Sequence, residues 1–199
     1  TRGSESNRQM SSPLILGFDT SGPHCAAALI KGETVLHACG EDMARGQAER
    51  LVDFLQEVLA VQEKTWADLD ALAVGTGPGN FTGIRIGVSA ARGLALGLNI
   101  PAYGVTGFEA RANIAPEGAL IAIPAPRDML YVSDAQGAHL VPMGEVTNAA
   151  PNPTPPDLAT GAAWQAARVW PTTPNPPAPF YVRAPDAAPA RDAPPRILT

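Results

Sequence analysis

Residues 75–97 read GTGPGNFTGIRIGVSAARGLALG, and this stretch decides the fold prediction. It opens as a glycine-rich loop and continues from near Thr82 as a helix, which ends before Pro101. Short apolar runs that read as buried strands flank it, at 71–75 (ALAVG) and 102–105 (AYGV). A strand, a loop, a helix and a second strand in this order predict part of a layered α/β structure.

The residues before this stretch extend the α/β pattern. Three short strands are predicted at 14–19, 25–31 and 34–40, and Gly32 marks a tight turn between the last two. Residues 48–61 form an amphipathic helix, because apolar residues recur at intervals of three and four. The order of three strands, helix, strand, helix and strand therefore predicts mixed sheets flanked by helices.

The residues after Pro116 are less regular, because most of the 21 prolines of the chain gather after Pro151. Short strands are predicted at 119–123, 130–133, 139–141 and 180–183, and a short helix capped by Asp157 at 157–168. We therefore divide the chain into a tail (1–12), an N-terminal lobe (13–106) and a smaller, proline-rich C-terminal lobe (107–199).

Small residues follow one another at intervals of four along the predicted helix, at Gly83, Gly87 and Ala91. A glycine inside a helix costs about 1 kcal/mol relative to alanine, so several of them need a reason. The small face lets another backbone approach closely. That backbone belongs either to the sheet beneath or to a helix of a partner.

Asp19-Thr20-Ser21 is the first candidate for chemistry, because it combines the carboxylate and hydroxyls with which ATPases approach phosphate and magnesium. The alternative is an Asx or ST turn that closes a hairpin. The loop GTGPGNFTG lacks the Gly-Lys-Ser/Thr ending of a phosphate-binding loop. The three histidines lack the spacing of a metal site, and no GxSxG motif occurs. The residues alone do not support an enzyme.

The composition narrows the functional classes. The 199-residue chain has a net charge of −5, which argues against a protein that binds nucleic acid mainly through its own electrostatic field. Two cysteines make no disulfide framework. The most apolar stretch (84–101) contains Arg85 and Arg92, which argues against a membrane span, and no signal peptide is evident. We expect a cytoplasmic protein without a membrane anchor.

The segments GPGNFTGIR (77–85) and FDTSGPHCAAALI (18–30) resemble the TsaB (YeaZ) family, the inactive relatives of the TsaD (Gcp-type) threonylcarbamoyltransferase. The resemblance covers about residues 14–115 and implies the actin-like ATPase superfamily fold, with two lobes, of which the second is shortened. It implies a non-catalytic subunit that supports TsaD in the threonylcarbamoylation of tRNA adenosine next to the anticodon. The alternative is an ATP-binding small-molecule kinase or ATPase of the same fold.

The resemblance also implies partners and cofactors. The expected partners are a TsaD-type transferase and a TsaE-type ATPase, with a homodimer as the alternative for the isolated chain. Contact with tRNA would occur mainly through the complex. No cofactor is expected in this subunit, whereas ATP and a metal ion are expected in the partner subunits. Asp19, Thr20 and Ser21 would then be a vestigial phosphate site.

TsaD-type chains carry an HxxxH metal-binding pair that aligns with Gly107 and Arg111 here. Neither residue binds a metal as histidine does, so no metal and no catalytic residue are expected in this subunit. The family pairs the helices of its first lobe with those of a partner. The predicted interface comprises Leu51, Leu55, Leu59, Gly83, Arg85, Ile86, Gly87, Ala90, Ala91 and Leu94.

Overall fold

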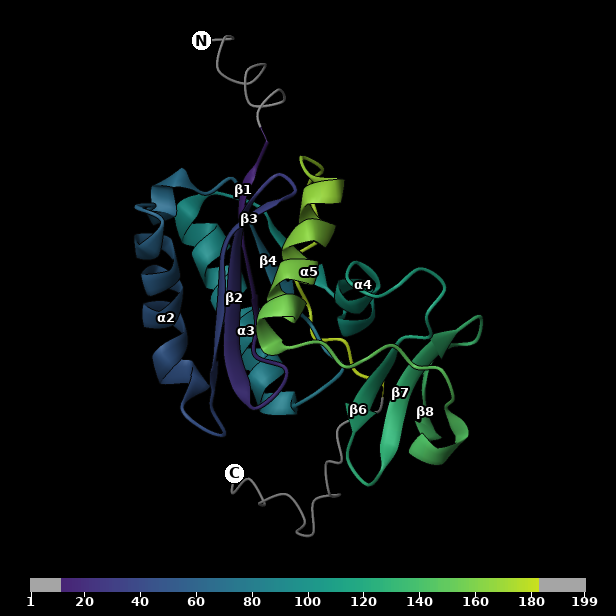
Figure 1. Cartoon of the computed structure of the whole chain (residues 1–199). Coiled ribbons are helices and arrows are strands. Elements are labelled where there is room, and N and C mark those ends of the chain that lie inside the picture. The colour runs from purple at the N-terminus through teal and green to yellow at the C-terminus, as the bar shows by residue number, and fades with distance from the viewer. Residues whose placement is uncertain (1–11, 183–199) are drawn as a thin grey trace, which may run out of the picture.

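The computed structural model describes residues 12–182 and contains two sheets and four α-helices within them (Figure 1). Eleven residues of the predicted tail, and Arg183 of the last predicted strand, lie outside the described range. The elements of the first part are β1 (Leu14–Asp19), β2 (His24–Lys31), β3 (Thr34–Asp42), α2 (Gln47–Val61), β4 (Ala71–Gly75), α3 (Phe81–Leu98), β5 (Ala102–Val105) and α4 (Gly107–Ala112). The second part contains β6 (Ala122–Ala125), β7 (Met129–Asp134), β8 (Gly137–Pro142) and α5 (Pro155–Val169).

The larger sheet has the strand order β3-β2-β1-β4-β5. Strands β1, β2 and β3 form an antiparallel meander, whereas β1, β4 and β5 run parallel. Every residue of β1 and β4 is buried, because helices cover both faces of the sheet. The predicted order of strands and helices is confirmed from β1 to β5, and β1, β4 and β5 have the predicted bounds, whereas α4 was not predicted.

The side chains of β1 alternate between two cores. Leu14, Leu16 and Phe18 face α2 and α3, and pack with the buried leucines of α2. Ile15 faces the opposite side, where it packs with alanines of α5. This alternation follows from the pleat of a strand, and it places the predicted site residues at the end of β1 between two layers of helices.

Helix α5 lies against the larger sheet, although it comes from the segment assigned to the C-terminal lobe. Its alanine-rich face meets Gly17, where an added Cβ would lie 2.5 Å from the carbonyl oxygen of Ala159. The predicted helix is confirmed with a longer range, but the predicted cap is wrong. Thr154 is the N-cap, and Asp157 is the third residue of the capping box.

The smaller sheet is antiparallel, with the order β6-β7-β8 (Figure 1). Ala122, Leu130 and Val132 form its small apolar cluster, to which Val141 and Val146 add partly buried side chains. The strands predicted at 130–133 and 139–141 lie within β7 and β8, whereas the strand predicted at 119–123 overlaps β6 only at residues 122 and 123. Residues 180–182 are not a strand in the structure, so that prediction is wrong for the described part of the segment.

Candidate functional site

Asp19, at the end of β1, is 5% exposed and accepts three hydrogen bonds on Oδ1. The donors are the backbone N of Ser21 at 2.9 Å, the Ser21 Oγ at 2.8 Å and the His24 Nε2 at 2.9 Å. Burial alone would raise the pKa of Asp19. The hydrogen bond and charge of His24, together with the Ser21 hydrogen bonds, lower this pKa below its ordinary value instead.

Thr20 is fully buried, and its hydroxyl donates to the carbonyl oxygen of Gly83 at 2.7 Å. The backbone N of Asn80 donates to the carbonyl oxygen of Ser21 at 2.7 Å. These two bonds fasten the turn between β1 and β2 to the first turn of α3. The polar groups predicted as a vestigial phosphate site thus hold the turn, and the Thr20 side chain has no exposed surface for a ligand.

The row of small residues in α3 faces its own chain. An added Cβ on Gly83 would overlap the carbonyl oxygen of Thr20, and one on Gly87 would lie 2.6 Å from Thr20 Oγ1. Ala91 is fully buried in the core beneath α2 and α3. Of the two explanations for this row, the close approach within the chain accounts for these three positions.

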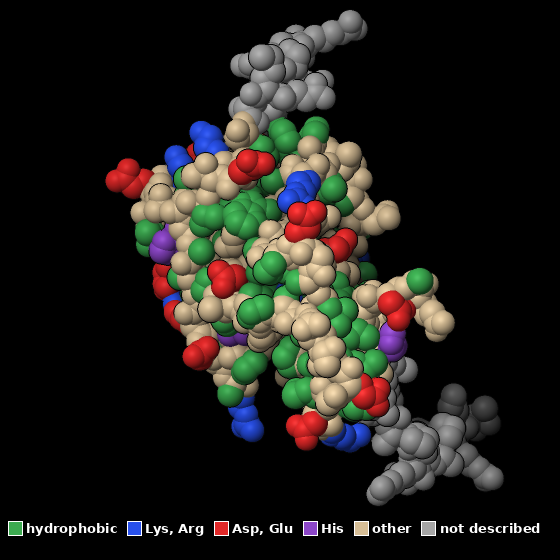
Figure 2. All heavy atoms as spheres, turned by 45° about the vertical axis from the view of Figure 1, so that its right-hand side comes forward, with side chains coloured by type: hydrophobic (Ala, Val, Ile, Leu, Met, Phe, Trp, Pro, Cys, Tyr) green, Lys and Arg blue, Asp and Glu red, His purple; other side chains and the backbone are tan. Residues whose placement is uncertain are grey.

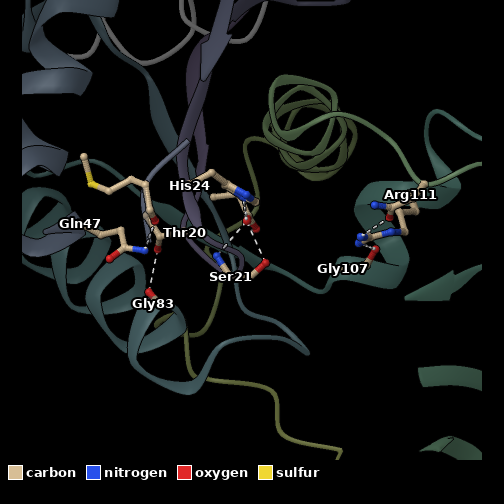
Figure 3. A network of polar contacts seen from close by, with 10 residues as sticks. Thr20, Ser21, His24, Gln47, Gly83, Gly107 and Arg111 are labelled. Carbon is tan, nitrogen blue, oxygen red and sulfur yellow. Dashed lines mark hydrogen bonds and ion pairs between the residues drawn. The ribbon is translucent and has the colours of Figure 1, made fainter. Parts of the chain in front are cut away.

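Gly107 and Arg111 lie one turn apart on α4, as their spacing requires (Figure 3). The Arg111 Nη1 donates to the Gly107 carbonyl oxygen at 3.1 Å and lies 3.1 Å from the place of a Cβ on Gly107. Burial lowers the pKa of Arg111, and the charge of Asp19 opposes that shift. An arginine nevertheless remains protonated, so the guanidinium puts a fixed positive charge where a side chain at position 107 would point.

The predicted interface divides between core and surface. The leucines at 51, 55 and 59 are buried against the sheet, as are Gly83, Gly87 and Ala91. Arg85 is exposed, and Ile86, Ala90 and Leu94 are partly exposed. An open groove of about 510 Å³ runs between α2 and α3. It is lined by Ala48, Leu51, Val52, Phe81, Thr82, Arg85, Ile86, Ser89 and Ala90.

The end of the described chain returns to the start of α3, which the sequence reasoning missed. The Tyr181 ring stacks on Phe81 with 5.0 Å between centroids, and its hydroxyl accepts from the Arg85 Nε at 3.0 Å. The Arg85 guanidinium lies 3.8 Å from the Phe81 centroid. The backbone N of Phe180 donates to the Thr76 carbonyl oxygen at 2.8 Å. Two adjacent aromatic residues in a proline-rich segment were the available signal.

Residues 12–182 contain no group of three or more histidine, cysteine, aspartate or glutamate side chains placed to hold a metal ion. None of the helices within this range is long and apolar enough to cross a membrane.

The family model of TsaD, described as tRNA N6-adenosine threonylcarbamoyltransferase, matches residues 39–153. An uncharacterized protein of Mycobacterium tuberculosis is 32% identical, over 88% of this chain and 94% of that protein. The tRNA threonylcarbamoyladenosine biosynthesis protein TsaB of Escherichia coli is 41% identical, over 46% of this chain and 39% of its own length. TsaB of Haemophilus influenzae is 33% identical, over 62% of this chain and 54% of its own length. The matches thus span about half of the TsaB relatives or less.

Solved structures share the fold. YeaZ from Pseudomonas aeruginosa superposes with a TM-score of 0.63 at 24% identity, over 85% of this chain and 99% of that one. An uncharacterized protein from the same organism, described as similar to peptidase YeaZ, gives a TM-score of 0.68 at 24% identity, over 86% of this chain and 100% of that one. The expected fold class is therefore confirmed. The chain belongs to the TsaB (YeaZ) family and has its actin-like ATPase-type fold.

Proposed function

We propose that this chain is a non-catalytic subunit that binds a TsaD-type transferase and supports the threonylcarbamoylation of tRNA adenosine. The observation that carries the proposal is the pair formed by Gly107 and Arg111. Family membership places the chain in threonylcarbamoyladenosine biosynthesis, and this pair argues that the transfer step takes place in another subunit.

The pair opposes metal binding for two reasons. Glycine offers no side-chain ligand, and the Arg111 guanidinium, with no lone pair to donate, lies beside it. A divalent cation at this position would also meet a fixed positive charge in a buried environment, where repulsion is screened less than in water. Restoring a metal site here would therefore require more than one substitution.

The surface of α2 and α3 is our candidate for the partner interface. The groove between them is mostly apolar, and Val52 at its edge is 45% exposed. Farther along α3, an added Cβ on Gly93 or Gly97 would meet nothing within 4 Å beyond the adjacent backbone of the helix itself, and Leu96 is 86% exposed. Exposed glycines in a helix destabilise it, and an approaching partner helix would account for them. Arg85, Ile86, Ala90 and Leu94 remain in this proposed interface.

We assign contact with tRNA mainly to the complex of this chain with its partners. The chain carries a net charge of −5. On the face shown in Figure 2, acidic and basic side chains are interspersed, and the described surface there has no continuous basic patch. Binding to a polyanion gains most of its free energy from phosphate contacts with lysine and arginine. A partner with a basic surface would therefore have to supply most of them.

Reconstitution tests the proposal. The chain is mixed with TsaD-type and TsaE-type proteins of the same organism, and threonylcarbamoyl transfer to tRNA is followed with each component omitted in turn. We expect transfer only when the chain is present, and none when the TsaD-type protein is omitted. Transfer by the chain without the TsaD-type protein would refute its non-catalytic role. Unchanged transfer without the chain would refute the supporting role.

A further inference from the structure

A second pocket, remote from the groove between α2 and α3, lies where α4 and the loop after it meet the segment before α5. Its volume is about 420 Å³. Apolar side chains, including Ile114, Ile121 and Ala150, form much of its wall. Arg111, Asn152 and Asp157 supply its polar side chains together with Thr154. An apolar pocket with a few convergent polar groups is the usual form of a small-molecule site.

Arg111 is the unusual member of this pocket. The residue is 8% exposed, and its Nε has no hydrogen-bond partner among the described residues. Its guanidinium has five N–H donors. Within residues 12–182 the bonded acceptors are the Gly107 carbonyl oxygen and the Asn152 Oδ1, each at 3.1 Å. Both acceptors are neutral, and no described carboxylate lies within 4.0 Å of the guanidinium, so the charge of Asp19 acts on it only from farther away.

A buried cation without a direct counter-ion is unfavourable unless an anion pairs with it. The geometry of the guanidinium suits a carboxylate or a phosphate, both of which can accept two parallel hydrogen bonds. Asp157 distinguishes between these two ligands. Its carboxylate also lines the pocket, and it accepts hydrogen bonds from the backbone N and the hydroxyl of Thr154 at 3.1 and 2.5 Å. This negative charge disfavours a dianion more than a monoanion.

We propose that this pocket binds a small aliphatic monocarboxylate, with the carboxylate on Arg111 and the alkyl chain against Ile114 and Ile121. Asn152 holds the guanidinium in place through its Oδ1. The proposal concerns this pocket alone and does not depend on the partner-subunit role. Its success or failure is therefore separate from that of the reconstitution.

The test is a ¹H–¹⁵N NMR titration of the full chain with sodium butyrate. The uncharged isostere butyramide and inorganic phosphate serve as parallel probes. We expect saturable shifts at the Arg111 Nε and at the amides of Ala150 and Asn152, with a millimolar Kd. Butyramide should bind at least tenfold more weakly, because it lacks the charge-assisted hydrogen bonds. Phosphate should also bind more weakly than butyrate.

Two substitutions locate the binding. Ala150→Phe keeps Arg111 but places a large side chain in the pocket, so it should abolish the butyrate shifts. Arg111→Met removes the charge and should weaken butyrate binding at least tenfold, whereas Arg92→Met, at an exposed position on α3, should leave it unchanged. If Arg111→Met does not fold, Ala150→Phe still decides the question. Equal binding of butyrate and butyramide, tighter binding of phosphate, or butyrate shifts that persist in Ala150→Phe would overturn the proposal.

Discussion

Gly87 and Gly93 lie six residues apart in the interior of α3, and their surroundings predict opposite effects of the same substitution on stability. Alanine gains about 1 kcal/mol over glycine at an open helix position. Gly93 is such a position, because beyond the adjacent backbone of α3 nothing lies within 4 Å of its added Cβ. Gly93→Ala should therefore raise the free energy of unfolding by up to about 1 kcal/mol.

Gly87→Ala meets the opposite situation. Its Cβ would lie 2.6 Å from Thr20 Oγ1 and 3.3 Å from Val74 Cγ2, so the turn after β1 would have to move. Overpacking costs about 1–3 kcal/mol. Moving Thr20 also weakens its 2.7 Å bond to Gly83, worth about 1 kcal/mol. After subtraction of the helix-propensity gain, Gly87→Ala should lower the free energy of unfolding by about 1–3 kcal/mol.

Urea unfolding followed by circular dichroism compares the two variants with the native chain. The midpoints should move in opposite directions, and the two free energies should differ by about 1–4 kcal/mol. If Gly87→Ala were as stable as Gly93→Ala, the close contact between α3 and the turn after β1 would not be the reason for the glycine.

Three further predictions concern the rest of the molecule. Because the folded pKa of Asp19 lies below its unfolded value, the interactions of its carboxylate stabilise the fold above about pH 4 and are lost as pH falls through the folded pKa. Asp19→Asn should therefore reduce the loss of the free energy of unfolding at acidic pH. An unchanged pH dependence of this free energy would contradict the prediction. In urea unfolding, Tyr181→Ala should lower the free energy of unfolding by about 0.5–1.5 kcal/mol through loss of the stack on Phe81. Tyr181→Phe keeps the ring and loses only the hydrogen bond from Arg85, so it should lower this free energy by less. Burial raises the pKa of the Cys25 thiol to about 11, so at pH 8 a thiol reagent should modify Cys25 in the folded protein more slowly than the partly exposed Cys39. Equal rates for the two cysteines in the folded protein would contradict the burial of Cys25.

The strands and helices of the first part were predictable because their apolar residues are local and periodic. The run at 14–19 is apolar on both faces, and a strand covered on both faces by helices requires that pattern. The amphipathic stripe of α2 was equally clear. The surface against which this stripe packs could not be predicted. Leu55 packs against the chain's own sheet, and periodicity cannot distinguish this arrangement from a subunit interface.

The contacts that define the sites join residues distant in the sequence, so spacing could not reveal them. Arg111 and Asn152 are 41 residues apart, and Arg85 and Tyr181 are 96 apart. The proximity of His24 to Asp19 was easier to predict, because a hairpin turn brings the chain back to Asp19 five residues later. Its role as a hydrogen-bond donor to a buried carboxylate still depended on burial, which the sequence does not give.

Substitutions at Gly87 or Ala91 are poor tests of partner binding, because both positions face the chain's own interior. Gly93→Trp is better suited, since its side chain would project from the exposed surface of α3. Gly144→Trp is the matched control, because Gly144 also has nothing within 4 Å of an added Cβ and lies beside the smaller sheet. Both proteins are first shown to be folded by circular dichroism.

Isothermal titration of a TsaD-type protein of the same organism with these two variants and the native chain tests the central claim most directly. We predict saturable binding of the native chain and of Gly144→Trp with equal affinity, and at least tenfold weaker binding of Gly93→Trp. Absence of binding by the folded native chain would contradict the partner-subunit role. Equal affinity of all three proteins would instead place the interface away from α2 and α3.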